Sequence, residues 1–182
     1  MLEVKFYDTV DDSLLKFAVI ISQSNGKWVF CKHKERDTWE VPGGHRESNE
    51  DIIDTAKREL FEETGAIDFD ISPICIYSVT APDNFDGVET FGKLFFAEIH
   101  TFEKELHSEI EKIAIMDELP INWTYPEIQP KLLEEARKRG FLPKKDEIKW
   151  LFFDVGSTLV DESKVYEDRM KRICLLYTSD AA

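Results

Sequence analysis

Three glutamates lie within one short stretch of this chain, close enough to act on a single ligand. Glu59, Glu62 and Glu63 stand at i, i+3 and i+4, a spacing that places side chains on one patch of a helix. Like charges this close repel each other, so such a patch is either solvated or filled by a cation. Mg²⁺ fits it, because this ion takes oxygen ligands from a few carboxylates together with substrate phosphates. A solvated acidic helix face is the alternative that the three residues alone leave open.

A helix must position these carboxylates, and the neighbouring residues predict where it begins and ends. Apolar residues recur at every fourth position and form one stripe: Ile52, Ala56 and Leu60. Ser48 predicts the N-cap, with Asp51 three residues further on as in a capping box. Gly65 predicts the end of the helix, since glycine readily takes the left-handed conformation that terminates helices.

The stretch from Gly44 to Ala66 resembles the Nudix box, Gly-x5-Glu-x7-Arg-Glu-U-x-Glu-Glu-x-Gly-U, where U is a bulky apolar residue. The matching positions are Gly44, Glu50, Arg58, Glu59, Leu60, Glu62, Glu63 and Gly65. Ala66 is a mild departure at the last position, and Trp39 with the Pro42–Gly44 turn is also similar to the family. So many matches at fixed spacing favour this resemblance over an ordinary amphipathic helix.

The resemblance implies an α/β fold, the Nudix-type α/β/α sandwich, with a mixed sheet between helices and the box as a loop-helix-loop. It implies hydrolysis of a phosphoanhydride bond in a nucleoside diphosphate linked to a further group, with Mg²⁺ as cofactor or Mn²⁺ in its place. The metal ligands would be Glu59, Glu62 and Glu63, together with a backbone carbonyl near Gly44. The resemblance covers about residues 1–140 and is specific within residues 39–66.

Catalytic roles are also carried over from the resemblance. A carboxylate acts as general base towards the attacking water, and Glu62, Glu63 and Glu109 are the candidates. Glu109 is taken from a region where many Nudix enzymes place a further carboxylate, with Glu111 as the second choice. Arg58 is expected to orient a glutamate through a bidentate pair rather than touch substrate.

The expected substrate is a small nucleotide: a nucleoside triphosphate, with 8-oxo-dGTP among the candidates, cleaved to monophosphate and pyrophosphate. Lys32 and Arg36 lead into the box and are candidates for phosphate contacts, with solvated loop charge as the alternative. Asn84 and Phe85 lie at the tip of a polar loop, where an amide and an aromatic ring could read and stack a base. A simple turn is the alternative for that loop.

The bulk composition narrows the partners. A net charge of −14 disfavours long nucleic acids, whose affinity comes from cationic contacts to phosphate, whereas a bound metal inverts the local electrostatics for a small nucleotide. Three widely spaced cysteines, Cys31, Cys75 and Cys174, predict free thiols in a reducing compartment. No apolar run is long enough to span a membrane, and the N-terminus does not resemble a signal peptide. We therefore expect a cytoplasmic protein; the sequence does not predict its oligomeric state.

Two other functions stay open beside the cleavage of nucleoside triphosphates to monophosphate and pyrophosphate. An RNA 5′-end pyrophosphohydrolase is disfavoured by the negative charge, and a non-catalytic sensor on a Nudix fold is disfavoured because all three box glutamates are present.

The remaining elements can be predicted from apolar patterns and turn residues. We expect strands over residues 3–7, 14–21, 27–33, 69–79, 88–99 and 109–115, with the second and third joined by an Asn25-Gly26 hairpin turn. A further helix is expected to open at Thr124-Tyr125-Pro126 and to end at Gly140. The Nudix domain is therefore predicted to occupy residues 1–143.

Residues 144–173 are predicted to be a linker and the start of a second domain. An apolar strand ends at Asp154, which stands where haloacid dehalogenase-like hydrolases carry their nucleophile; Thr158 and Leu159 follow that pattern and Gly156 departs from it. A strand and one helix are too short to close a core, so we expect a truncated, inactive fragment, the alternative being a two-enzyme fusion. Residues 174–182 are similar to a translated sequencing adapter and are predicted to be a non-native tail.

Overall fold

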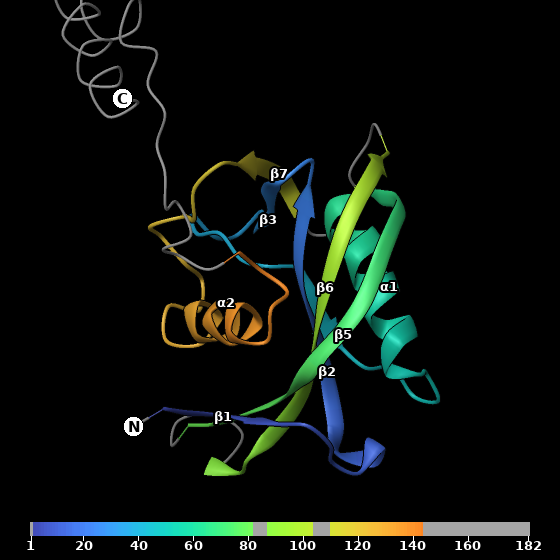
Figure 1. Ribbon diagram of the computed structural model, residues 1–182, viewed down its shortest axis with the longest axis vertical. Helices are drawn as coiled ribbons and strands as arrows, with labels where there is room; N and C mark the ends of the chain where they lie inside the picture. The colour runs from blue at the N-terminus through green and yellow to red at the C-terminus, as the bar shows by residue number, and fades with distance from the viewer. Residues whose placement is uncertain (1, 82–86, 104–109, 144–182) are drawn as a thin grey trace, which may run out of the picture. The chain divides into compact units, whose positions relative to one another are not determined.

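The structure is a computed structural model that describes residues 2–81, 87–103 and 110–143 (Figure 1). These residues fall within one compact unit. The predicted segments 144–173 and 174–182 lie outside the described residues, so the division of the chain into domains stays a prediction. Asn84, Phe85 and Glu109 lie outside them as well. No helix in the described part is long and apolar enough to cross a membrane.

A mixed, seven-stranded sheet forms the centre of the fold. Its strands are β1 (Glu3–Tyr7), β2 (Leu15–Ser24), β3 (Lys27–His33), β4 (Gly43–His45), β5 (Ala66–Thr80), β6 (Thr90–Phe102) and β7 (Ile110–Met116). The order is β1-β5-β6-β2-β3-β7, and β4 pairs with β2 beside this path. Only the β2–β6 pair is parallel among the described strands; the others are antiparallel. The predicted strands are thus confirmed, with ends that shift by a few residues.

The hairpin between β2 and β3 turns at the predicted dipeptide. Asn25 and Gly26 have φ angles of 52° and 75°, and two consecutive positive φ values are what a type I′ turn requires. The pairing of Ser24 with Lys27 directly beyond the turn confirms the hairpin.

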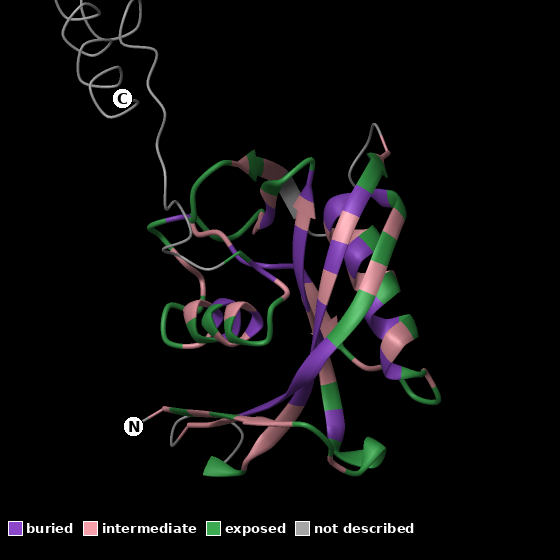
Figure 2. Ribbon diagram, viewed as in Figure 1, coloured by how far each residue is buried: buried purple, intermediate pink, exposed green. Residues whose placement is uncertain are grey.

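Helix α1 (Ile52–Thr64) covers one face of the sheet and α2 (Gln129–Lys138) covers the other (Figures 1 and 2). Each helix has its own apolar core because side chains alternate between the faces of a strand. In β2, Ile20 packs in the α1 core whereas its neighbour Ile21 packs in the α2 core. The α1 core includes the predicted stripe of Ile52, Ala56 and Leu60. The predicted α/β/α sandwich is therefore confirmed.

The predicted starts of both helices are wrong. The N-cap of α1 is Asp51, not Ser48, because residues 47–50 form a turn in which Asn49 has a φ of 66° and Glu50 N–H donates to the Glu47 carbonyl. Helix α2 begins at Gln129, so its first-turn proline is Pro130 instead of Pro126. The ends are as predicted: Gly65 is the C-cap of α1, with a φ of 71°.

Replacing Leu60 by Ala is expected to lower the free energy of unfolding by about 2–5 kcal/mol. Leu60 is completely buried between α1 and the sheet, so its removal leaves a cavity. Ile67→Ala is the control, because that side chain is 57% exposed and its loss should change stability by no more than about 0.5 kcal/mol. Urea unfolding measures both, and equal losses would contradict this packing.

Candidate active site

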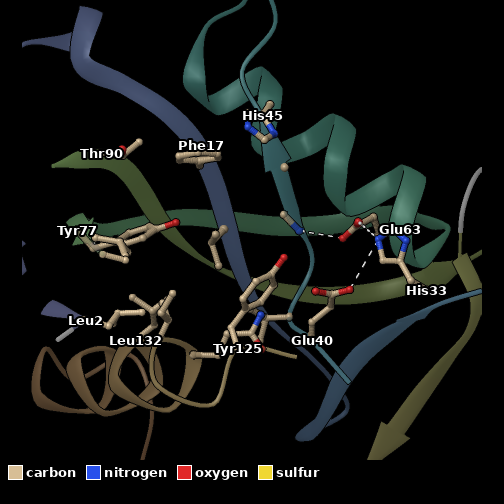
Figure 3. A pocket seen from close by; sticks show the side chains of 18 of the residues that line it. Leu2, Phe17, His33, Glu40, His45, Glu63, Tyr77, Thr90, Tyr125 and Leu132 are labelled. Atoms are coloured by element: carbon tan, nitrogen blue, oxygen red, sulfur yellow. Dashed lines mark hydrogen bonds and ion pairs between the residues drawn. The ribbon is translucent and has the colours of Figure 1, made fainter. Parts of the chain in front are cut away.

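A cavity of about 390 Å³ opens beside the box (Figure 3). Gly43, Gly44 and Glu63 line it on the box side, and the start of α2 lines it elsewhere with Gln129 and Leu132. Further residues of its wall include Phe17, Val19, Tyr77 and Tyr125. Its size falls in the range of about 300–1,000 Å³ that small-molecule sites occupy. The cavity thus combines a box carboxylate with an aromatic, apolar wall.

Glu63 is the box glutamate that lines this cavity, and the protein around it favours its protonated form. Its Oε2 accepts a hydrogen bond from Gly43 N at 2.9 Å, and its Oε1 lies 3.6 Å from His33 Nε2. Burial raises its pKa to about 8; the Gly43 hydrogen bond opposes this shift, while the charges of Glu59 and Glu40 add to it. A carboxyl with such a pKa can hold or release a proton near neutral pH.

Arg58 binds three carboxylates at once. Its Nε and Nη2 contact Glu50 Oε1 and Oε2 at 2.9 and 3.1 Å, which is a bidentate pair. Its Nη1 lies 2.7 Å from Glu59 Oε1 and 3.2 Å from Glu62 Oε2. Nη2 also donates to the His45 carbonyl at 3.0 Å, which ties α1 to β4. Arg58 thus fixes the orientation of the acidic patch.

Glu50 stays ionised because of this pair. The Arg58 hydrogen bonds lower its pKa to about 2, and the Glu47 N–H and the Thr55 hydroxyl add to the effect. Its carboxylate joins the turn before α1 to the helix itself, which is a bracing contact rather than a place on the cavity wall.

Glu40 is a site residue that the sequence analysis missed. It is 6% exposed, burial raises its pKa, and its Oε1 has no hydrogen-bond partner among the described residues. His33 Nε2 lies 3.7 Å from that oxygen, and Arg36 Nη1 lies 3.5 Å from the other. The one signal in the sequence was its position between Trp39 and the Pro42–Gly44 turn.

The two described residues predicted to contact substrate, Arg36 and Lys32, lie in different places in the structure. Arg36 lines the cavity; its guanidinium lies 5.8 Å from the centre of the Tyr125 ring, and Nη1 donates to the Tyr125 hydroxyl at 3.4 Å. Lys32 instead pairs with Asp37 at 2.7 Å. Tyr125 and Gln129 are cavity residues that the sequence analysis did not single out, because nothing in their local pattern distinguishes them from the turn and helix around them.

The box residues fit a hard divalent cation in their donor chemistry. The carboxylates of Glu59 and Glu62 already share one positively charged atom, Arg58 Nη1, and oxygen ligands of this kind suit Mg²⁺. Gly44 leaves room for them, since a Cβ there would overlap the Glu59 carboxylate. In their present positions, no three His, Cys, Asp or Glu side chains of the described residues are grouped to hold a metal.

The family model of the NUDIX domain matches residues 13–144, so the chain belongs to the Nudix family. It is a hydrolase of phosphoanhydride bonds.

Individual relatives agree with this placement. The chain is 29% identical to the putative 8-oxo-dGTP diphosphatase YtkD of Bacillus subtilis over 121 residues, which cover 66% of this chain and 73% of that protein. It is 56% identical over 34 residues to nucleoside diphosphate-linked moiety X motif 6 of Mus musculus, 19% of this chain and 11% of that protein.

Two solved structures share the fold. The Bacillus subtilis pyrophosphohydrolase BsRppH, a point mutant, has a TM-score of 0.64 at 24% identity and covers 77% of this chain and 92% of its own. A NUDIX hydrolase from Nitrosomonas europaea has a TM-score of 0.57 at 21% identity, over 68% and 89% of the two chains.

Alanine at Gly43 and at Gly44 should have different effects. A Cβ at Gly43 would lie 2.5 Å from the Ala18 carbonyl oxygen and 2.9 Å from Val19 Cα, so the backbone of β2 must move and stability falls by about 1–3 kcal/mol. A Cβ at Gly44 meets the far end of a flexible side chain, Glu59. Gly44→Ala should therefore cost less stability and mainly reduce hydrolysis. Urea unfolding measures the stabilities, and an assay of phosphoanhydride hydrolysis measures the activity. The reverse order of stabilities would contradict this prediction.

Glu63→Gln should remove a pH dependence of stability. The pKa of Glu63 is raised from 4.5 to about 8 in the folded protein, so its contribution to stability is fully present below pH 4.5 and is lost as the pH rises through about 8. Glutamine stays neutral and can still accept the Gly43 hydrogen bond. The Tm of the variant minus that of the wild type should grow with pH. The growth should be about 2–4 °C for each kcal/mol of unfolding free energy that the wild type loses.

Thermal unfolding in EDTA is measured at about pH 5.5 and at about pH 8.5. Between these two pH values the folded protein passes through the raised pKa of Glu63, so most of the change in Tm difference should fall between them. Glu127→Gln, at an exposed position, is the matched control. A constant difference between Glu63→Gln and the wild type at both pH values would show that Glu63 ionises normally.

Proposed function

We propose that this protein hydrolyses nucleoside triphosphates, oxidised ones such as 8-oxo-dGTP included, to nucleoside monophosphate and pyrophosphate, with Mg²⁺ as cofactor. One observation carries the proposal: the box glutamate Glu63 lines a cavity whose remaining wall is largely aromatic and apolar. Such a cavity suits a ligand with a charged end and a planar, apolar end. The similarity to a putative 8-oxo-dGTP diphosphatase over 73% of that protein supports the same substrate class.

Glu59, Glu62 and Glu63, with the Gly44 carbonyl, would hold Mg²⁺, and the ion when bound neutralises the phosphate oxygens and stabilises the leaving phosphate. Arg58 keeps Glu59 and Glu62 on one side of the helix through its Nη1 contacts. The chain's own residues then supply the proton transfer and the placement of the nucleotide.

We assign Glu63 as the acceptor of the proton from the attacking water. It faces the cavity, and the cation that it helps to hold would favour its ionised form, which is the form that accepts a proton. Glu62 is the alternative, since its side chain is 40% exposed. Arg36, beside Tyr125 on the cavity wall, is the cationic side chain in reach of the nucleotide.

Small nucleotides are favoured over the 5′ ends of RNA. The likeness to BsRppH concerns the fold, at 24% identity, whereas a net charge of −14 repels a long polyanion. We place the enzyme in the cytoplasm, where nucleoside triphosphates are found and where the free thiols of Cys31 and Cys75 stay reduced.

The test uses the full chain with Mg²⁺ and a panel of dNTPs, 8-oxo-dGTP, ADP-ribose and 5′-triphosphorylated RNA, with pyrophosphate and phosphate followed separately. We expect pyrophosphate release from free triphosphates. Glu62→Gln and Glu63→Gln should lower kcat by about 10²-fold or more, while Glu127→Gln should not.

Other outcomes would contradict the proposal in distinct ways. Stepwise release of phosphate would mean attack at a different phosphorus atom. Turnover of the RNA alone would favour the RNA 5′-end pyrophosphohydrolase. A folded protein that binds Mg²⁺ without any turnover would favour the non-catalytic sensor.

A further inference from the structure

A buried thiol beside the box lies among polar groups instead of apolar ones. Cys31 is completely buried, but neither apolar core of the described residues includes it. Its sulfur lies 3.5 Å from Glu63 Oε2 and 3.4 Å from the backbone oxygen of Glu40. A buried cysteine ordinarily packs as a small apolar side chain, so this place beside a box carboxylate needs another explanation.

The strand that carries Cys31 fixes the direction of its thiol. Cys31 lies on β3 two residues after Val29, so the two side chains point to the same face of the sheet. Val29 packs in the α1 core, and Glu63 belongs to α1. Cys31 also exchanges two backbone hydrogen bonds with Glu40, both of 3.0 Å. The thiol therefore approaches Glu63 from a fixed position on the sheet.

The thiol is the donor in this contact. Burial raises the pKa of Cys31, and the charges of Glu63 and Glu40 add to the shift, so the sulfur keeps its proton. Two oxygens lie in reach of that proton, Glu63 Oε2 and the Glu40 carbonyl. The Glu40 carbonyl already accepts the N–H of Cys31, and a carboxylate is the stronger acceptor. The S–H group is therefore directed at Glu63.

Two donors meet on the same oxygen of Glu63. Gly43 N–H donates to Oε2 at 2.9 Å from β4, and Cys31 S–H donates to Oε2 from β3. Oε1 lies on the side of His33, 3.6 Å from its Nε2 (Figure 3). An oxygen with two lone pairs is filled by two donors. Oε1 is thus the oxygen that remains for a cation or for the proton of a water.

We propose that Cys31 is a positioning residue for Glu63: its thiol and the Gly43 N–H together hold Oε2, which turns Oε1 towards the cation and the attacking water. The inference rests on the proposed function, because it takes Glu63 as a ligand of Mg²⁺ and as the acceptor of the proton. The terminal torsion of a glutamate rotates over a broad range. Two donors from neighbouring strands remove that freedom before the substrate arrives.

Variants of two buried cysteines test the proposal. Cys31→Val removes the donor and keeps a side chain that suits a strand, whereas Cys31→Ser keeps a donor. Cys75→Val is the matched control, because Cys75 is the other buried cysteine of the described residues and packs in the α2 core.

Pyrophosphate release from dNTPs at saturating Mg²⁺ is the first readout. Cys31→Val should lower kcat by about tenfold, less than Glu63→Gln does. Its KM should stay nearly unchanged, because the thiol positions a catalytic group and touches no part of the nucleotide. Cys31→Ser and Cys75→Val should keep nearly the kcat of the wild type.

Two further readouts do not depend on turnover. In a calorimetric titration without nucleotide, Cys31→Val should bind Mg²⁺ more weakly than the wild type, Cys31→Ser and Cys75→Val. The infrared difference between the wild type and Cys31→Ser isolates the S–H stretch of Cys31. This band should lie at a lower frequency than that of Cys75, obtained from the wild type and Cys75→Val, because a hydrogen bond to oxygen weakens the S–H bond.

A double variant separates positioning from packing. In the Glu63→Gln background, Cys31→Val should cost little further activity, because the carboxylate that the thiol positions is absent. An equally large loss in that background would show that Cys31 acts on some other group.

Other outcomes also overturn the inference. Equal losses in Cys31→Val and Cys31→Ser would make the effect one of packing, and unchanged kcat and Mg²⁺ affinity in Cys31→Val would leave the contact without a role. An S–H band at the frequency of Cys75 would show that the hydrogen bond is absent. The proposed function fails separately: a wild type that releases no pyrophosphate, while Cys31→Val binds Mg²⁺ more weakly than Cys31→Ser, loses the activity and keeps the positioning of Glu63.

Discussion

The guanidinium of Arg58 contacts the carboxylates of Glu50, Glu59 and Glu62 at once. Without it, negative charges on neighbouring turns of α1 and on the preceding turn would repel one another. One arginine cannot offset the whole cluster, because three carboxylates share its single charge and Glu63 adds a fourth, whose pKa burial raises to about 8. The box therefore keeps an excess of acidic groups beside a cavity, and a divalent cation would balance this excess.

The fold brings this cluster and the cavity wall together from opposite faces of one sheet. Helix α1 presents the box glutamates, β4 passes Gly43 and Gly44 close to β2, and α2 closes the cavity from the other face with Gln129 and Leu132. Much of this arrangement could be predicted, because apolar periodicity, the Asn25-Gly26 turn and glycine helix ends are local signals. The start of α1 could not, since Glu50 lies outside the helix and pairs with Arg58, eight residues away, a contact that no local pattern signals.

The site was predictable where its residues follow each other in the chain. The spacing along one helix is enough to place the carboxylates of Glu59 and Glu62 at Arg58, whereas Glu63 lines the cavity. Glu40 escaped notice because its importance comes from burial and from an oxygen without a partner among the described residues, which depend on how distant segments pack. Lys32 is not among the residues of the cavity wall, which its neighbour on β3, His33, does line, because successive side chains of a strand point to opposite faces.

A calorimetric titration of the full chain with Mg²⁺, in the absence of nucleotide, tests whether the acidic cluster around Arg58 is a site for a divalent cation. The wild type should bind Mg²⁺, Glu59→Gln and Glu63→Gln should each bind it at least about tenfold more weakly, and Glu127→Gln should match the wild type. Equal binding by all four proteins would place the cation elsewhere on this acidic surface and would show that the cluster around Arg58 is not its site.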